Sequence, residues 1–97
     1  MVKHIVMFRL KGSDEERKNL AFKFRDALMA LPSRIECLRS LEAAVNSNPS
    51  ETWDIVLTAV VDNFEDLEKY ATHPLHLAAA DIIKNNKEDR ACVDYEF

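Results

Sequence analysis

A chain of 97 residues is long enough for one domain, and a composition of 47% hydrophobic and 31% charged residues excludes a disordered protein. The 13 Lys and Arg residues against 17 Asp and Glu residues give a formal net charge of −4, and no basic run is long enough to follow a phosphate backbone, so nucleic acid is excluded as an expected partner. A domain this small buries only about 60 to 65% of its unfolded surface, so we expect a partner subunit to add to its stability.

The sequence also indicates the compartment. No apolar stretch approaches the roughly 20 residues that cross a bilayer, and the first residues do not resemble the apolar core of a signal peptide. We therefore expect a cytoplasmic protein that has no membrane partner. Cys37 and Cys92 lie far apart without CxxC spacing, so we expect free thiols that pack as small apolar side chains.

The spacing of apolar residues predicts the first strand and the first helix of the chain. Residues 3–10 (KHIVMFRL) alternate as a strand does, and this strand is apolar on both faces near its centre. Residues 13–31 then place apolar side chains at helical spacing, Ser13 and Glu16 form a capping box, and Pro32 ends the helix. One row of the strand holds His4, Val6, Phe8 and Leu10, and the other holds Lys3, Ile5, Met7 and Arg9.

The rest of the chain predicts three more strands and two more helices. Residues 47–51 are turn formers, so the strands on either side of them are expected to pair antiparallel. Asp62 or Asn63 can cap the first of the helices, and Pro74 suits the first turn of the second. The predicted strands cover residues 37–46, 52–62 and 90–97, and the predicted helices cover 64–71 and 74–86.

The order strand, helix, strand, strand, helix, strand predicts an α+β fold. It is the ferredoxin-like βαββαβ sandwich, in which an antiparallel four-stranded sheet has helices on one face. The central strands carry more apolar surface than one layer of helices can hide, so a second subunit that packs its sheet against this one would cover the other face. That surface comprises Ile5 and Met7 with one of two rows of the 52–62 strand, either Ile55, Leu57, Ala59 and Val61 or Val56 and Val60.

Three stretches of the chain resemble one known family. VKHIVMFRLK at the start, YATHPLH in the middle and RACVDYEF at the end are similar to the stress-responsive dimeric α/β barrel family, and the resemblance covers essentially the whole chain. Members of that family are ferredoxin-like domains that pair sheet to sheet into an eight-stranded barrel. The resemblance therefore implies a homodimer formed through the sheet faces.

The resemblance also implies a site. Enzymes of the family that resemble plant polyketide cyclases close a linear poly-β-keto chain by intramolecular aldol condensation, with no metal or organic cofactor. His76 matches their acid/base, Tyr70 matches the residue that orients or polarises the substrate, and His4 matches a strand histidine of the same pocket. Many bacterial members share these residues without a known reaction, so the match implies a site more directly than an activity.

The residue types suit this chemistry on their own properties. Closing a carbon–carbon bond in a β-polyketide needs a base of near-neutral pKa and a donor for the developing enolate, which histidine and tyrosine supply. His76 is expected to point toward the sheet, beside a hollow, because it shares a helical face with small or apolar side chains. His4 is expected on the helix side of its strand, so the two imidazoles should approach one pocket from opposite walls. The residues that share the face with His76 are Ala79, Ala80 and Ile83.

Each of these residues also has a structural interpretation. His76 and Tyr70 lie on apolar helix faces, where they can pack as satisfied core side chains. His4 can supply polarity near a strand end. His73 precedes Pro74, which fits a helix cap or a surface hydrogen bond. Trp53 begins a core strand, where packing explains it better than the lining of a ligand cavity.

His73 and His76 have the spacing of two metal-binding imidazoles, and Asp81 nearby could add an oxygen ligand. Zinc sites need three or four ligands in fixed geometry, and Pro74 interrupts the helical phase between the two histidines. We therefore predict no metal and no cofactor.

Three functions follow from this sequence. The first is a cofactor-free cyclase or isomerase for a small carbonyl compound, with His76 as general base, Tyr70 as donor and His4 assisting. The second is a non-catalytic dimer that binds an apolar small molecule or has a structural role under stress. The third is cofactor-independent oxygenation of an electron-rich aromatic compound. The sequence carries no signature that specifies the ligand.

Overall fold

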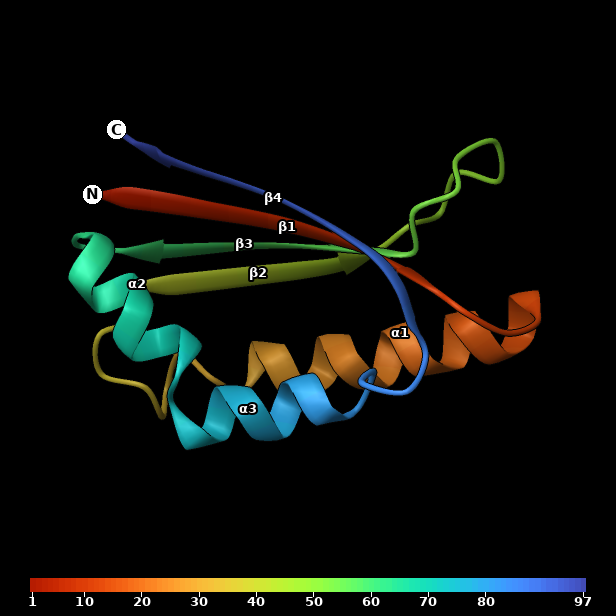
Figure 1. Ribbon diagram of the computed structural model, residues 1–97, viewed down its shortest axis with the longest axis horizontal. Coiled ribbons are helices and arrows are strands. Elements are labelled where there is room, and N and C mark those ends of the chain that lie inside the picture. Colours follow the sequence, from red (N-terminus) through yellow and green to blue (C-terminus); the bar gives the residue numbers. More distant parts are fainter.

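A four-stranded antiparallel sheet with three helices on one face makes up the computed structural model, which describes residues 1–97 (Figure 1). The strands lie in the order β2-β3-β1-β4, so the first and third strands of the chain are central. This is the predicted ferredoxin-like arrangement, with the second helix of the pattern divided in two. In chain order the elements are β1 (Val2–Leu10), α1 (Asp14–Met29), β2 (Ser40–Val45), β3 (Ile55–Val61), α2 (Phe64–Ala71), α3 (Pro74–Asp81) and β4 (Lys87–Glu96).

Several boundaries differ from the sequence prediction. The helix expected over 74–86 ends at Asp81, because the next backbone N–H groups, those of Ile82 and Ile83, bond three residues back rather than four and tighten the chain into turns. The last strand begins at Lys87 instead of residue 90, since it pairs with Leu10 beyond a register shift. The helix α1 and the strands β2 and β3 are shorter than predicted by one to three residues at their ends, where helices and strands commonly fray.

The start of α1 follows the predicted capping box. The Ser13 hydroxyl accepts from the Glu16 N–H at 3.2 Å, and the Glu16 carboxylate accepts from the Ser13 N–H at 3.2 Å. Gly12, just before the cap, has a φ of 123°, which favours glycine because a side chain there would be strained. The inward residues of α1 are Ala21, Phe24 and Leu28.

The register of the sheet decides which rows face the helices. Val6 of β1 lies opposite Leu57 of β3, and both are buried under the helices. Because side chains alternate along a strand, Val56 and Val60 must lie on the other face. Of the two rows considered for β3, the helix-facing one is therefore Ile55, Leu57, Ala59 and Val61.

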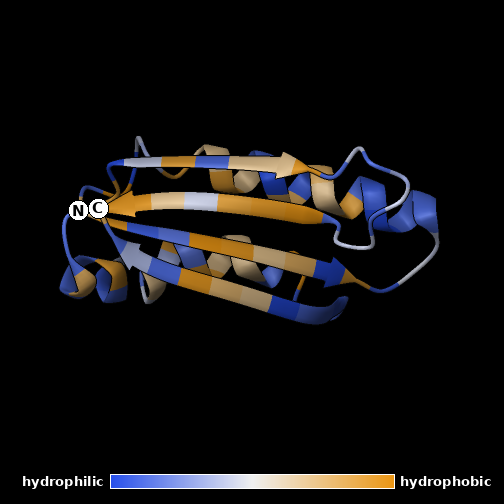
Figure 2. Cartoon of the chain, turned by 90° about the horizontal axis from the view of Figure 1, so that it is seen from above, coloured by the Kyte–Doolittle hydropathy of each residue, from blue (hydrophilic) through white to orange (hydrophobic).

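The opposite face of the sheet has no cover in the single chain; Figure 2 looks onto it, with the helices behind. Ile5 lies there between Thr58 and Val93, and Met7 lies beside Val56. Val93 and Tyr95 on β4 are 62% and 41% exposed, unusually high for apolar side chains of a sheet. The chain thus leaves an apolar face open, as the sequence predicted.

No helix of the protein combines the length and the apolar character needed to cross a membrane. Both cysteines are free, with Cys37 in the turn before β2 and Cys92 within β4. These positions agree with the expected free thiols.

Replacement of the cap residue tests the account of α1. Ser13→Ala should lower the free energy of unfolding by about 1 kcal/mol, because it removes the side-chain partner of an end-of-helix N–H. Chemical denaturation measures this loss. Ser50→Ala, in an exposed loop, is the matched control and should change stability little; equal effects of the two substitutions would contradict the capping role.

Candidate active site

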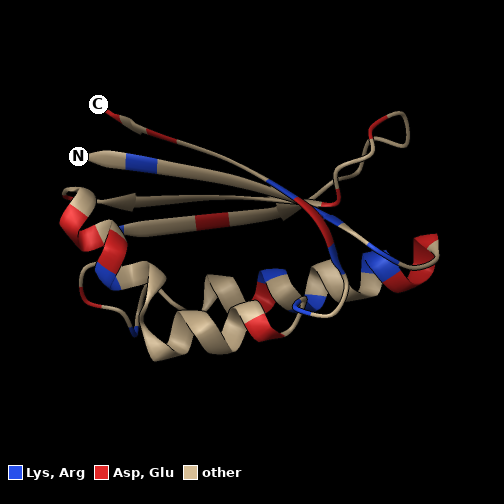
Figure 3. Cartoon of the chain, in the orientation of Figure 1, with Lys and Arg blue, Asp and Glu red and all other residues tan.

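Three elements bring the predicted site residues together. Tyr70 lies in the last turn of α2 with only 1% of its surface exposed. The chain then turns at Thr72 and His73 and starts α3 at Pro74, which returns His76 toward the same tyrosine. His4 comes from the helix-facing row of β1, beneath α2. Most of α3 carries no Lys, Arg, Asp or Glu (Figure 3), so the α3 side of this site is weakly charged.

The three rings form one cluster, which we call the His–Tyr cluster (His4, Tyr70 and His76). The ring centroids of Tyr70 and His76 are 4.6 Å apart with the planes inclined by 51°. Those of His4 and Tyr70 are 6.3 Å apart in an edge-on arrangement. Ala79 on α3 and Ile83 just after it are buried and Ala80 is half-buried, in agreement with the prediction that the face shared with His76 turns inward.

The tautomer of His76 follows from its hydrogen bond. Its Nδ1 lies 2.9 Å from the carbonyl oxygen of Ala71, and a carbonyl can only accept, so Nδ1 carries the proton. In the neutral ring the Nε2 lone pair is then available. Burial lowers the pKa of His76 below 6.5, with a smaller opposing effect from the bond to Ala71, so the neutral ring predominates at neutral pH. His76 is thus a half-buried imidazole with a free basic nitrogen.

The Tyr70 hydroxyl is buried and makes no hydrogen bond within the protein. Buried hydroxyls usually find a partner, since an unpaired one costs about 1 to 3 kcal/mol. Burial also raises the pKa of Tyr70 far above its usual value, so the group stays protonated and keeps a proton to donate. The cluster therefore contains an unused donor beside a free acceptor.

His4 has a partner that the sequence analysis missed. Its Nδ1 contacts the carboxylate of Asp94, which lies directly opposite it in the β1–β4 ladder. The carboxylate accepts from Nδ1–H and so fixes the orientation of the ring, with Nε2 left free. The alternation of β4 places Cys92 and Asp94 in one row, but only the register with β1 shows that this row meets His4.

His73 caps α3. Its Nδ1 accepts from the Leu75 N–H at 3.1 Å, which agrees with the cap interpretation of this residue. His73 and His76 each use Nδ1 for a local backbone bond, and Asp81 lies at the far end of α3. His73, His76 and Asp81 therefore do not form a common set of metal-binding donors.

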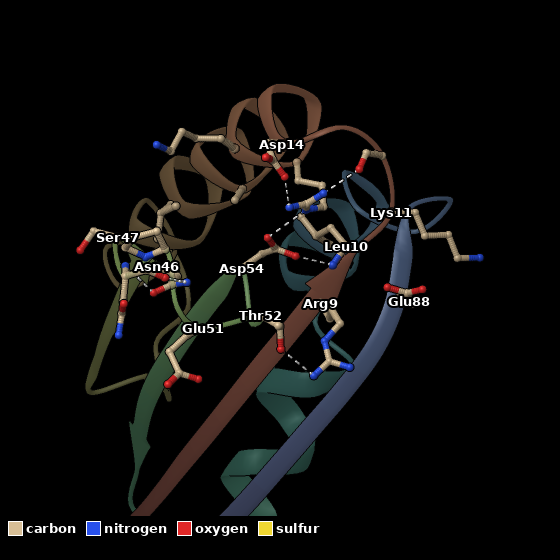
Figure 4. A pocket seen from close by; sticks show the side chains of 17 residues that line it. Arg9, Leu10, Lys11, Asp14, Asn46, Ser47, Glu51, Thr52, Asp54 and Glu88 are labelled. Atoms are coloured by element: carbon tan, nitrogen blue, oxygen red, sulfur yellow. Dashed lines mark hydrogen bonds and ion pairs between the residues drawn. The ribbon is translucent and has the colours of Figure 1, made fainter.

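A depression of the surface lies away from the His–Tyr cluster. It measures about 720 Å³ and is bounded by the start of α1, the end of β1 and the loop before β3 (Figure 4). Three of its charged side chains form one network: Arg17 contacts Asp14 at 2.6 Å and Asp54 at 3.3 Å, and Asp54 also accepts from the Leu10 N–H at 2.6 Å. This network joins α1 to the sheet. The other charged residues of the lining include Lys11, Lys18, Glu51 and Glu88, which form no ion pair.

A second depression, of about 270 Å³, lies on the open face of the sheet. Six of its eight lining residues are hydrophobic, among them Met7, Trp53 and Val56. Trp53 is half-buried here and carries the Arg9 guanidinium over its ring at 4.4 Å. Neither depression is lined by His4, Tyr70 or His76. The pocket that the sequence predicts between His4 and His76 is therefore neither of these two depressions.

Comparison with known proteins agrees with this architecture. The family model of the stress-responsive A/B barrel domain matches residues 2–97. The chain belongs to the stress-responsive A/B barrel family. The predicted resemblance is thereby confirmed over almost the whole length.

Three relatives of this A/B barrel protein illustrate the comparison, and none of these three has an activity in its description. An uncharacterized protein of Streptomyces coelicolor is 33% identical over 101 residues, which cover 100% of both chains. A dimeric ferredoxin-like protein of unknown function from Bacteroides fragilis is 48% identical, with a TM-score of 0.95 over 99% of this chain and 95% of its own. A ferredoxin-like protein of the same family from Mesorhizobium loti is 20% identical, with a TM-score of 0.75 over 98% and 94% of the two chains, and shows the fold alone.

The tautomer and pKa of His76 are open to direct measurement. Nitrogen-15 NMR titration of the A/B barrel protein should show Nδ1 protonated, Nε2 unprotonated and a pKa below 6.5. Since the folded-state pKa lies below the unfolded value, the stability contributed by the neutral ring is present above pH 6.5 and is lost as the pH falls below it. A pKa at or above 6.5, or a proton on Nε2 of the neutral ring, would contradict this description.

Proposed function

We propose that this A/B barrel protein catalyses acid–base chemistry on a small poly-carbonyl compound, as a cyclase or isomerase. The observation that carries the proposal is the buried Tyr70 hydroxyl, which has no partner in the protein and lies beside a neutral imidazole with a free Nε2. A donor and an acceptor without protein partners are the pair that proton transfer and enolate stabilisation need. His4, oriented by Asp94, assists from the sheet side.

The reaction can be written on these atoms. His76 Nε2 removes a proton from a carbon between two carbonyl groups, and the electron pair moves onto one carbonyl oxygen as an enolate. The Tyr70 hydroxyl donates a hydrogen bond to that oxygen. In a cyclase the enolate carbon then attacks a second carbonyl of the same chain, and the protonated His76 returns its proton to the new alkoxide. In an isomerase the proton returns to a different carbon.

The open sheet face supports a homodimer. The Bacteroides fragilis relative, 48% identical, is described as dimeric. In the present chain a face that includes Ile5, Met7 and Val56 has no cover, and a small domain gains stability when such a face is buried. We propose that a second copy packs its own open face on this one and closes the barrel.

A second candidate function is a non-catalytic binding dimer. It is favoured by the position of the apolar depression with Trp53, which lies on the open face and apart from the His–Tyr cluster. In that case ligand affinity would depend on apolar wall residues such as Met7, and replacement of His76 would have little effect.

Substitution of the two central residues separates these functions. With a linear poly-β-keto thioester as probe, His76→Gln should lower turnover by about 10² to 10⁴-fold through loss of the base. Tyr70→Phe should lower it by about 10²-fold or more through loss of the enolate donor. The same Tyr70→Phe change should leave the free energy of unfolding unchanged or raise it by about 1 kcal/mol, because an unpaired buried hydroxyl is removed.

The control for the tyrosine is Tyr95→Phe on the open face, where the hydroxyl is not part of the cluster. It should keep wild-type turnover. A wild-type protein that leaves the probe unchanged, or a folded Tyr70→Phe variant of full activity, would contradict the catalytic proposal. Loss of stability in Tyr70→Phe would mean that the hydroxyl serves packing.

The dimer proposal has its own test. Val56→Asp places a charge in the centre of the open face and should convert the dimer to a folded monomer, as seen by light scattering after size exclusion. Phe22→Asp, at a 38% exposed position on α1, is the control and should stay dimeric. If Val56→Asp does not fold, Ile5→Lys replaces it. A dimer that persists in the variant that folds would show that the subunits meet elsewhere.

A further inference from the structure

Three side chains with different metal-binding atoms meet on the helix side of β1 and β4. They are His4, Cys92 and Asp94, and their donor atoms all lie within 4.8 Å of one another. We infer that they form a binding site for a divalent transition-metal ion of the zinc or cobalt type. This inference goes beyond the proposed acid–base function and does not rest on it.

The backbone holds these donors in place. In the antiparallel ladder His4 lies opposite Asp94, and Val6 lies opposite Cys92. Cys92 and Asp94 are two residues apart on one strand, so their side chains leave the same face of β4. All three therefore project from paired backbone of two neighbouring strands, which is a more rigid support than a loop.

The distances suit one ion. The Cys92 sulfur lies 3.5 Å from His4 Nδ1 and 3.5 Å from the Asp94 oxygen. With Zn–S near 2.3 Å and Zn–N or Zn–O near 2.0 Å, tetrahedral geometry separates sulfur from nitrogen or oxygen by about 3.5 Å. Only the His4–Asp94 pair, which is joined by a hydrogen bond, must open to admit the ion.

The ligand types point to the same class of metal. Thiolate and imidazole together favour zinc, cobalt and similar ions over magnesium or calcium, which prefer oxygen. The site is also partly shielded, with the side chains of His4 and Asp94 12% and 32% exposed. Three protein ligands leave a fourth position for water or another ligand, as in open zinc sites.

Other polar groups of the chain offer no such set. In the charged depression of Figure 4, Asp54 already accepts from Arg17 and from the Leu10 N–H, and Asp14 accepts from Arg17. A metal bound to Asp54 or Asp14 would take the carboxylate partners from Arg17. The neighbours of His4 are the Cys92 thiol and the Asp94 carboxylate, and neither forms an ion pair with Lys or Arg.

Cobalt absorption tests the site through its sulfur ligand. The full-length protein, freed of metal with a chelator and kept reduced, is titrated with Co²⁺. One Co²⁺ per chain should bind, with a near-ultraviolet thiolate-to-cobalt band and visible bands of tetrahedral cobalt, and added Zn²⁺ should remove both. Cys92→Ser should abolish the thiolate band and weaken binding at least about tenfold. Asp94→Asn should weaken binding while the thiolate band persists at saturating cobalt.

Cys37→Ser is the matched control, because Cys37 lies in the turn before β2, where its thiol contacts the Asp66 carbonyl, and should leave the spectrum unchanged. The inference is overturned if the wild type gives no thiolate band, if Cys92→Ser keeps it, or if Cys37→Ser loses it. Turnover of Cys92→Ser separates the two proposals, since Cys92 has no part in the acid–base steps. If Cys92→Ser loses cobalt binding but keeps full turnover, the result supports both the metal site and the acid–base function.

Discussion

The fold depends on the pairing of β1 with β3 at the centre of the sheet, where both strands are apolar on both faces. This pairing buries one row of side chains, including Val6 and Leu57, under the helices. It leaves a second row, including Ile5 and Val56, on the far face. Because one layer of helices can cover only one of these rows, the single chain leaves the other row open, and this is the face on which we propose that a second copy packs.

The same pairing places the His–Tyr cluster. His4 belongs to the row that faces the helices, so its ring enters the space between the two layers instead of the open face. The break at Pro74 divides what would be one helix into α2 and α3, and this division allows Tyr70 and His76 to approach each other. A dimer formed through the open face would leave the helix side of the sheet, where the cluster lies, uncovered by the partner. Under the two proposals, subunit pairing and acid–base chemistry would use opposite faces of one sheet.

Much of this architecture could be predicted from the sequence, because it depends on local signals. The alternation of KHIVMFRL, the capping box at Ser13 and the position of Pro74 each determine an element within a few residues. The grouping of His4, Tyr70 and His76 could be anticipated from family resemblance and from helical phase. The sequence pattern predicts α3 to continue to residue 86, beyond its end at Asp81, because the tightening of the chain after Asp81 depends on tertiary packing that no local pattern expresses.

What the sequence could not supply is the pairing of distant strands. Asp94 and Cys92 lie about ninety residues from His4, and only the β1–β4 register makes them its neighbours. The unpaired state of the Tyr70 hydroxyl likewise depends on every side chain packed around it.

The central claim, that the two-faced sheet is completed by a second copy, is tested most directly by sedimentation equilibrium of the unaltered protein from nanomolar to micromolar concentration. The account predicts a folded species of twice the 11.1 kDa chain mass, whereas a folded species of the single-chain mass at micromolar concentration would contradict it.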